Sequence, residues 1–473
     1  MLKKISNIFK RNTKQIPNEP NILSSGKHPL SPKKISSGAR KVVEQLASDG
    51  YEAYLVGGCV RDLMMGLKPK DFDVATNATP EQVKELFRRS RIVGRRFQIV
   101  HVRMGSEVIE VTTFRAHHSK KDSTKNSAKN GTKHTEKKTH RDKSQRSAKG
   151  MLLRDNMFGS IDEDASRRDF TMNAFYYHPQ DNSIYDYANG LPDIENRLIR
   201  IIGNPEERYR EDPVRMLRAL RFAAKLGFNL EDRTAQAITK TCKLLADIPP
   251  ARLFDEVLKL FMHGHALATF HLLREYQLFD TLFPATADAL SKDPGYYLKF
   301  IEQALTNTDL RIRSNKRVTP AFLYAALLWP AVKEKEQLFS QQGDSPIYVL
   351  QQAAGEVTTR QCQRIAIPRR FTLPMREIWE LQLRLPRRMG NQAFRLMENK
   401  RFRAGYDFLL LREETGEIES GLGLWWTSFQ DASEEKRLEM VQQVQKSQNP
   451  SRNKNRRRRK PSKSKAPETS RHD

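Results

Sequence analysis

The chain has 473 residues and a formal net charge of +27. This length exceeds an ordinary single domain, so we expect two or three compact units. The 3 cysteines form no CxxC pair, and no stretch approaches the ~20 apolar residues of a membrane span. These features argue against a disulfide framework, a cysteine-based zinc site and a transmembrane segment, so we expect a cytoplasmic protein whose basic start could still touch anionic lipid.

Most of the positive charge lies in three stretches that are poor in large apolar side chains. Residues 1–41, 117–150 and 450–473 carry +9, +8 and +8. Such segments bury too little surface to offset the entropy of ordering, so we predict that they are disordered. Their charge suits a polyanion such as RNA, because binding releases counterions from phosphates. The alternative is that they only keep the protein soluble.

The first ordered elements are predicted to alternate between helices and strands. Residues 41–47 are typical of a helix, and residues 51–56 of a strand that ends at Gly57 and Gly58 and leads directly into another helix. Residues 71–74 are predicted to be the next strand. Thr79 is then expected to cap a helix whose first residue is Pro80.

Further strands follow before the pattern becomes helical. Residues 98–103 and 108–112 are predicted to form a hairpin, and residues 183–187 and 198–202 short strands. From Asp212 onward apolar residues recur at helical spacing almost throughout. We therefore predict an α+β fold, in which a mixed sheet with helices is followed by an all-α remainder with disordered basic termini.

A pair of carboxylates is the first candidate for chemistry. Asp71 and Asp73 are two residues apart on a predicted strand, so their side chains are expected on the same face. Two neighbouring carboxylates repel each other unless a cation lies between them. Mg²⁺ prefers few carboxylates together with substrate phosphates and water, so the pair suits a metal–nucleotide site. Alone, however, such a pair occurs often on surface strands.

The glycine turn that precedes the carboxylates strengthens this interpretation. Gly57 and Gly58 let the backbone approach a phosphate closely, and the start of the following helix offers unpaired N–H groups. Arg61, one turn into that helix, can add a charge-assisted hydrogen bond to a triphosphate. A Gly-Gly turn followed about a dozen residues later by two aspartates is therefore more specific than either feature alone.

Four motifs in this order resemble a known family. They are LVGGCVRD with DFDV, EVTTFR from Glu110, SRRDFTMNAFYY from Ser166 and REDPVRMLRALRF from Arg210. Over roughly residues 40–265 the chain resembles the class II nucleotidyltransferases of the polymerase β superfamily, which include bacterial poly(A) polymerases and CCA-adding tRNA nucleotidyltransferases. The resemblance implies a polymerase-β-like catalytic head, followed by helical neck, body and tail regions, that uses ATP or CTP with Mg²⁺.

The resemblance also implies roles for individual residues. Asp212 and Arg215 match family residues that hydrogen-bond the base of the incoming nucleotide, and Arg218 lies beside them on one polar helix stripe. An acceptor and a forked donor can together mimic a base-pairing partner. Gly227 is expected to end this helix.

A second set of matched residues surrounds the SRRDFT motif. Arg167, Arg168 and Asp169 match family residues that contact the nucleotide. The third acidic group stays open between two residues. We assign Asp169 provisionally to catalysis, whereas Glu110 lies on a strand that should run beside residues 71–74.

The predicted reaction is in-line attack of an RNA 3′-hydroxyl on the α-phosphorus of ATP with release of pyrophosphate. One metal ion would activate the hydroxyl and another would neutralise the leaving phosphates. The Gly94 to Phe97 run and residues 364–390 resemble the poly(A) polymerase branch. The predicted function is thus template-independent polyadenylation of RNA 3′ ends, linked to RNA decay and its proteins. A CCA-adding enzyme and a non-catalytic RNA-binding protein are the alternatives.

The domain organisation follows from these assignments. We expect a disordered arm, a catalytic head with a disordered insert, a neck with the nucleotide-selecting helix, a helical body with an RNA-binding C-terminal domain, and a disordered tail. Their boundaries are 1–40, 41–205 with the insert 117–150, 206–270, 271–445 and 446–473.

Overall fold

The computed structural model describes residues 19–94, 98–116, 145–146, 152–154, 157–293 and 295–448. Two compact units emerge from the packing of the chain. The first unit consists of residues 1–249 and 268–281, and the second of residues 250–267 and 282–473. Each unit is described below by itself.

An eight-stranded sheet forms the centre of the first unit. Its spatial order is β1 (Asn21–Leu23), β10 (Ser183–Asp186), β9 (Phe175–His178), β2 (Ala53–Val56), β3 (Asp73–Thr76), β6 (Glu107–Thr113), β5 (Ile99–Met104) and β4 (Ser90–Val93). Neighbouring strands are antiparallel except β3 and β6, which run parallel. The parallel pair lies in the middle of the sheet.

The two faces of this sheet carry two separate hydrophobic cores. Alternate residues point to opposite faces, so Leu55 and Val74 join one core while Val56 and Ala75 join the other. The larger core contains residues of α2 (Ser37–Ser48), α3 (Gly58–Met64) and α4 (Pro80–Leu86). The smaller core includes Ala165 of α5 (Ile161–Arg167).

Short helices complete the first unit after the sheet. In chain order they are η3 (Thr171–Asn173), α6 (Leu191–Glu195), α7 (Pro205–Glu211), α8 (Val214–Leu226), α9 (Asp232–Thr241), η4 (Cys242–Asp247) and most of α11 (Ala266–Glu275). The two-residue strands β11 (Leu198–Ile199) and β12 (Asn229–Leu230) pair in parallel. The short strands β7 (Gln145–Arg146) and β8 (Leu152–Arg154) form a separate antiparallel pair.

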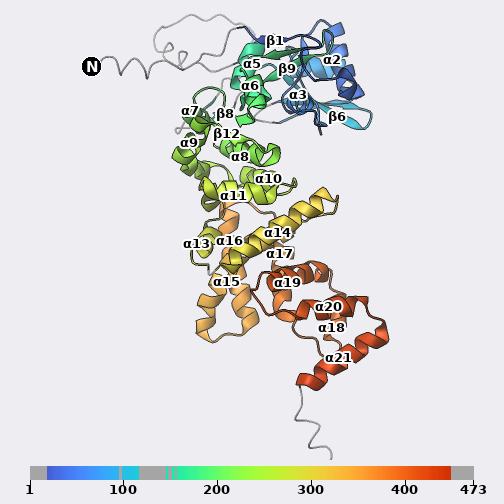
Figure 1. The fold of residues 1–473 in the computed structure, drawn as a ribbon, viewed down its shortest axis with the longest axis vertical. Helices are drawn as coiled ribbons and strands as arrows, with labels where there is room; N and C mark the ends of the chain where they lie inside the picture. Colours follow the sequence, from blue (N-terminus) through green and yellow to red (C-terminus); the bar gives the residue numbers. More distant parts are fainter. Residues whose placement is uncertain are drawn as a thin grey trace, which may run out of the picture. The chain divides into compact units, whose positions relative to one another are not determined.

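The second unit is helical throughout its described residues, which Figure 1 colours from yellow-green to red. Its helices are α10 (Pro250–Phe261), α13 (Pro284–Ser291), α14 (Tyr296–Arg313), α15 (Pro320–Phe339), α16 (Pro346–Arg364), α17 (Arg369–Arg384), α18 (Gln392–Met397), α19 (Phe402–Glu414), α20 (Leu422–Asp431) and α21 (Glu434–Gln448), with α12 (Leu278–Leu282) at its border and a 3-10 turn η5 (Ser340–Gln342). The predicted α+β fold with an all-α remainder is confirmed. No helix in the described part of the chain is long and apolar enough to span a bilayer.

Part of the predicted N-terminal arm is ordered, so the expectation of disorder over residues 1–40 is wrong for residues 19–40, the last four of which begin α2. In this range β1 pairs with β10, and Leu30 and Ile35 are buried in the larger core. The average composition of the arm concealed these two apolar residues. Residues 1–18 lie outside the described residues. So do most of the predicted insert and the predicted tail beyond Gln448.

Candidate active site

The two predicted carboxylates lie at the start of β3. Asp73 is the first residue of the strand, while the exposed Asp71 precedes it. The predicted strand over residues 71–74 is therefore shifted by two positions. In the parallel pair of β3 with β6, Asp73 lies opposite Glu110. Both residues alternate with core residues, Val74 and Val111, so both face the side of the sheet that carries the smaller core.

These carboxylates influence one another electrostatically. The pKa of Asp73 is raised to about 6, first because the group is buried and then because Glu110 and Asp71 add negative charge. Arg168 opposes this shift only in part. Glu110 also lies 3.5 Å from His101 Nε2. Three carboxylates that repel each other and supply only oxygen donors fit a hard divalent cation.

This donor set is not a closed cage. Among the described residues, no group of three or more His, Cys, Asp or Glu side chains is already gathered as metal ligands. Asp71, Asp73 and Glu110 therefore do not form a complete metal site by themselves, and a magnesium ion here would need substrate phosphates and water as further ligands. The residues at the start of β3 therefore fit a metal that binds together with its nucleotide.

The predicted glycine turn precedes α3 and has the backbone that its residues suggest. Gly57 has φ +72°, which favours glycine. A Cβ atom on Gly57 would lie 3.1 Å from Arg168 Nη1, and one on Gly58 would lie 3.6 Å from Arg61 Nη2. Two guanidinium groups therefore flank the turn, and any side chain at Gly57 would crowd one of them.

Arg61 points inward rather than out of the turn. Its side chain is only 3% exposed, and its Nη1 donates to Asn173 Oδ1 at 2.6 Å. Its Nε donates to Asp62 at 2.9 Å. Its Nη2 also donates to Asp62 Oδ1, so a direct bond to a triphosphate would need one of the two remaining N–H groups of this buried side chain. The predicted phosphate contact of Arg61 remains a prediction.

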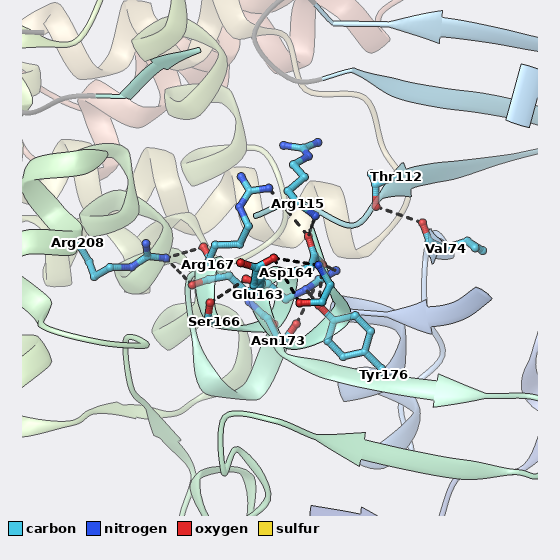
Figure 2. A network of polar contacts seen from close by, with 12 residues as sticks. Val74, Thr112, Arg115, Glu163, Asp164, Ser166, Arg167, Asn173, Tyr176 and Arg208 are labelled. Atoms are coloured by element: carbon cyan, nitrogen blue, oxygen red, sulfur yellow. Dashed lines mark hydrogen bonds and ion pairs between the residues drawn. The ribbon is translucent and has the colours of Figure 1, made fainter. Parts of the chain in front are cut away.

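Arg168 is held by a buried polar network at the end of α5. Its Nε donates to the Tyr176 hydroxyl at 2.8 Å, and its Nη2 lies 3.2 Å from Asp164 Oδ2. The Tyr176 hydroxyl donates to the same Asp164 oxygen at 2.6 Å. Figure 2 shows Asp164 at the centre of this network, with Tyr176 reaching it from the sheet. Burial opposes the charge of Arg168, but Tyr176 and Asp164 hold its pKa above the usual range.

The backbone of the SRRDFT motif is fixed by a residue that sequence reasoning missed. Arg208 of α7 donates from Nη2 to the carbonyl oxygens of Arg167 and Arg168, the latter at 2.7 Å (Figure 2). Burial, followed by the charge of Arg215, lowers the pKa of Arg208 to about 10. The Arg167 side chain lies 4.0 Å from Asp164. The buried position of Arg208 beside this motif could not be predicted from its place in the highly charged sequence PEERYRED.

The Asp169 carboxylate accepts hydrogen bonds from an arginine and from amide groups, whereas Asp73 is influenced by other carboxylates. Its Oδ2 accepts from Arg218 Nε at 2.7 Å, and its Oδ1 accepts from Asn173 Nδ2 at 3.0 Å. Burial alone would raise the pKa of Asp169, but Arg218 and the hydrogen bonds from Asn173 and the Phe170 backbone hold it well below its usual range. The two candidates for the third acid therefore have opposite surroundings.

The predicted polar stripe of α8 lies as expected on a partly exposed face. Asp212 Oδ1 accepts from the Val214 backbone N–H at 3.3 Å. Arg215 Nη1 donates to the carbonyl oxygen of Arg208 at 2.9 Å, and Arg218 pairs with Asp169. The opposite arc is buried, and it contains Met216, Leu217 and Leu220. The helix ends at Gly227 with φ +65°, which confirms the predicted cap.

One aromatic ring joins α8 to the glycine turn. The guanidinium carbons of Arg61, Arg218 and Arg221 lie 5.2, 5.5 and 4.8 Å from the centroid of Phe222. Lys225 Nζ, one turn further along, lies 3.8 Å from Asp62 Oδ2. These contacts pack α8, the predicted base-selecting helix, against α3, which begins at the predicted phosphate-binding turn.

Three family models match most of the chain. Residues 53–200 match a poly A polymerase head domain, residues 227–290 match a probable RNA and SrmB-binding site of polymerase A, and residues 342–462 match an arginine-rich polymerase A C-terminus. The chain is also 47% identical to poly(A) polymerase I of Salmonella typhimurium over 89% of this chain and 88% of that protein.

The chain belongs to the poly(A) polymerase family. With the family comes nucleotidyltransferase activity that uses a nucleoside triphosphate and a divalent metal ion. A CCA-adding enzyme of Lactobacillus helveticus is a more distant relative, 38% identical over 51% of this chain and 53% of that protein. The structure of a Bacillus stearothermophilus CCA-adding enzyme in complex with CTP aligns with a TM-score of 0.52 and 26% identity, over 86% of this chain and 82% of that chain.

By their electrostatic surroundings, the predicted residues fall into two groups. One group contains the carboxylates Asp71, Asp73 and Glu110, and the other the paired arginines around Asp169 and Asn173. Most of the segment from Gly94 to Phe97, which resembled the poly(A) branch, lies outside the described residues. The sequence missed Asn173, although it stands inside the SRRDFTMNAF motif.

Proposed function

We propose that this chain adds AMP from ATP to RNA 3′-hydroxyl ends without a template and that Mg²⁺ is its metal ion. The observation that carries the proposal is the extent of similarity. Sequence identity to a poly(A) polymerase I is 47% over about nine tenths of both chains, whereas sequence identity to a CCA-adding enzyme is 38% over about half of each.

Asp71, Asp73 and Glu110 would hold the metal in this proposal. The support is the burial of Asp73 and the negative charge of Glu110 and Asp71 beside it, which together raise its pKa and which a divalent cation would counter. When bound, such an ion stabilises developing negative charge and activates a hydroxyl at neutral pH. Glu110 thereby replaces Asp169 as the third acidic group, because the carboxylate of Asp169 is already neutralised by Arg218.

The arginine group would bind and orient the triphosphate. Arg168 and the Gly57-Gly58 turn lie in contact, so a phosphate at this turn would meet both a backbone and a guanidinium. Asn173 supports this arrangement as a positioning residue, because it bonds Arg61 and Asp169 at once and its carbonyl oxygen lies 3.4 Å from Arg168 Nη1. We assign Arg61 a supporting position and Arg167 a place at the edge of this group.

The transfer itself needs a bound and aligned pair of substrates. The RNA 3′-oxygen bonds to the α-phosphorus while the bond from that phosphorus to the leaving pyrophosphate breaks, and the hydroxyl proton passes to solvent. Asp212 and Arg215 would select adenine by their acceptor and donor pattern. Arg218, fixed by Asp169, would keep the neighbouring part of α8 in place.

The wider assignments are proposals as well. We propose a catalytic head over residues 41–205, a neck over 206–270 and an RNA-binding region within 271–445. A cytoplasmic location and association with proteins of RNA decay fit an enzyme that tags RNA 3′ ends.

The test is a primer-extension assay of the full chain with an unstructured RNA, Mg²⁺, and ATP or CTP offered separately. The proposal predicts a long ladder with ATP and little extension with CTP. A tRNA that lacks its 3′ end serves as the matched substrate. Addition that stops after a few residues on this tRNA, with no ladder on the unstructured RNA, would make the chain a CCA-adding enzyme.

A further inference from the structure

A pocket of about 670 Å³ lies in the second unit, away from the residues already assigned. It is lined by α14, the turn before α15, the start of α15, α17, and α19 with the residues before it. These helices pack on one another within the unit, and Figure 1 shows α14, α17 and α19 gathered there. The volume falls within the range of about 300 to 1,000 Å³ that is typical of small-ligand sites.

The lining of the pocket is strongly basic. Six of its residues are cationic and two are acidic: Arg311, Arg317, Arg370, Lys400, Arg401 and Arg403 against Asp407 and Glu414. Two cations are neutralised by carboxylates, since Arg403 Nε lies 3.0 Å from Asp407 and Arg401 Nε lies 2.8 Å from Glu377. Within the described residues, Arg370 and Lys400 form no ion pair with a carboxylate. The pocket therefore retains positive charge that a ligand could compensate.

The remaining lining is mostly apolar, with Asn307, Thr308 and Thr319 as its polar members. Leu310 is 56% exposed, although it faces a pocket wall that also contains Phe322 and Phe371. The exposed Arg370 guanidinium lies 4.9 Å from the centroid of Phe371, whose ring also stacks on Phe254 at 5.9 Å, so Phe371 supports the Arg370 plane and that plane offers a surface for stacking. An inorganic anion makes no favourable contact with an apolar wall, and an acidic peptide has no planar ring beside each negative charge.

A nucleotide within an RNA strand has the required combination of phosphate and flat base. Single-stranded RNA is commonly bound by stacking of bases on aromatic or guanidinium planes while cations hold the backbone. We propose that this pocket binds one nucleotide of the RNA substrate upstream of its 3′ end, with Arg370 and Lys400 at the phosphate and with Leu310, beside the Arg370 plane, at the base. The inference rests on the proposed function and places an RNA contact outside residues 227–290, which match the RNA-binding model.

Equilibrium binding of an unstructured oligoribonucleotide to the full chain, without ATP, tests the charged part of the pocket. Arg370→Glu and Lys400→Glu should each weaken binding about tenfold. Each should also reduce the slope of log affinity against log salt concentration by about the amount that one lost phosphate contact gives. Arg369→Glu and Arg395→Glu are the matched controls. Both residues are exposed, lie on α17 and α18, and do not line the pocket. The controls should change affinity severalfold less.

The apolar part has its own pair of variants. Leu310→Ser should weaken RNA binding severalfold, whereas Leu338→Ser, at an equally exposed leucine on α15 outside the pocket, should not. Inorganic polyphosphate, which has charge but no bases, should compete poorly with RNA and should not distinguish Leu310→Ser from the parent protein. Unfolding midpoints of all variants identify any that lose the fold, and Arg370→Gln replaces one that does.

Two results would overturn the inference. Equal weakening by the pocket and control charge changes would mean that only the overall charge matters. A parent-like RNA affinity of Leu310→Ser, with polyphosphate or polyglutamate competing as well as RNA, would mean that the pocket takes an anion without a base. Because binding is measured without ATP, absence of adenylation would refute the proposed function but leave this test unaffected.

Discussion

The two groups of the candidate active site handle charge in opposite ways. At β3 and β6, Asp73 is crowded by Asp71 and Glu110, and its pKa is raised. Around Asp169, the carboxylate is matched by Arg218 and Asn173, and its pKa is lowered. The first group gains stability from an added cation. The charge of the second group is already balanced, so this group is suited to holding a substrate in a fixed position.

The largest effect is expected at Asp73. Asp73→Asn should reduce the rate of AMP addition by about a thousandfold, because the main ligand of the proposed metal loses its charge. Asp71→Ala should have a comparable effect, and single-turnover assays at saturating ATP would measure both. The folded structure should persist, as thermal unfolding would show. Substantial activity in either variant would contradict the assignment of this group.

The choice of the third acid gives the next effect. Glu110→Gln should lower kcat about a hundredfold while leaving the KM for ATP nearly unchanged, because it removes charge beside Asp73. Asp169→Asn should instead raise the KM for ATP and lower the free energy of unfolding by about 2 kcal/mol, because Arg218 loses its charged partner. Steady-state kinetics and denaturation of both variants separate the roles. A fall in kcat without a change in KM in Asp169→Asn would contradict the proposed contrast between the two groups.

A smaller effect is expected at Asn173, which belongs to the balanced group. Asn173→Ala should raise the KM for ATP about fivefold, since Arg61 and Asp169 each lose one hydrogen bond of roughly 1 kcal/mol. Asn173→Asp should be worse, because it places a second carboxylate beside Asp169. A positioning role requires that KM change more than kcat. Equal loss of kcat in both variants would point to direct catalysis by this residue.

The smallest effect is expected on the pH dependence of the free energy of unfolding, measured without divalent ions. Because the pKa of Asp73 in the folded protein is raised to about 6 from 3.8, its protonated form favours folding. This contribution is fully present below pH ~4 and is lost as the pH rises through ~6. Asp73→Asn should therefore stabilise the metal-free protein at pH 7 by on the order of 1 kcal/mol and leave it unchanged at pH 4. Denaturant unfolding of both proteins at pH 7 and pH 4 measures this difference in the free energy of unfolding.

Local features of the fold could be predicted from the sequence because neighbouring residues determine them. The cap of Thr79 on α4 is confirmed as a capping box with Gln82, and the hairpin of β5 and β6 spans the expected residues. Gly227 ends α8 as expected. In each case, the signal lies within a few residues of the element that it shapes.

Long-range pairings could not be predicted in the same way. The ion pair of Asp169 with Arg218 spans 49 residues, and the bond of Arg61 to Asn173 spans 112. The register that places Glu110 opposite Asp73 depends on the order of strands in the sheet, which short motifs do not specify. The sequence therefore identified the candidate residues but left the third acid open.

Binding of Mn²⁺, a paramagnetic substitute for Mg²⁺, tests the central claim most directly. Electron paramagnetic resonance of the full chain with a non-hydrolysable ATP analogue would measure it for the parent, Asp73→Asn, Glu110→Gln and Asp169→Asn proteins. The account predicts that the first two variants bind Mn²⁺ at least about tenfold more weakly and that Asp169→Asn binds it like the parent. Loss of Mn²⁺ binding in Asp169→Asn, with parent-like binding in Glu110→Gln, would contradict it.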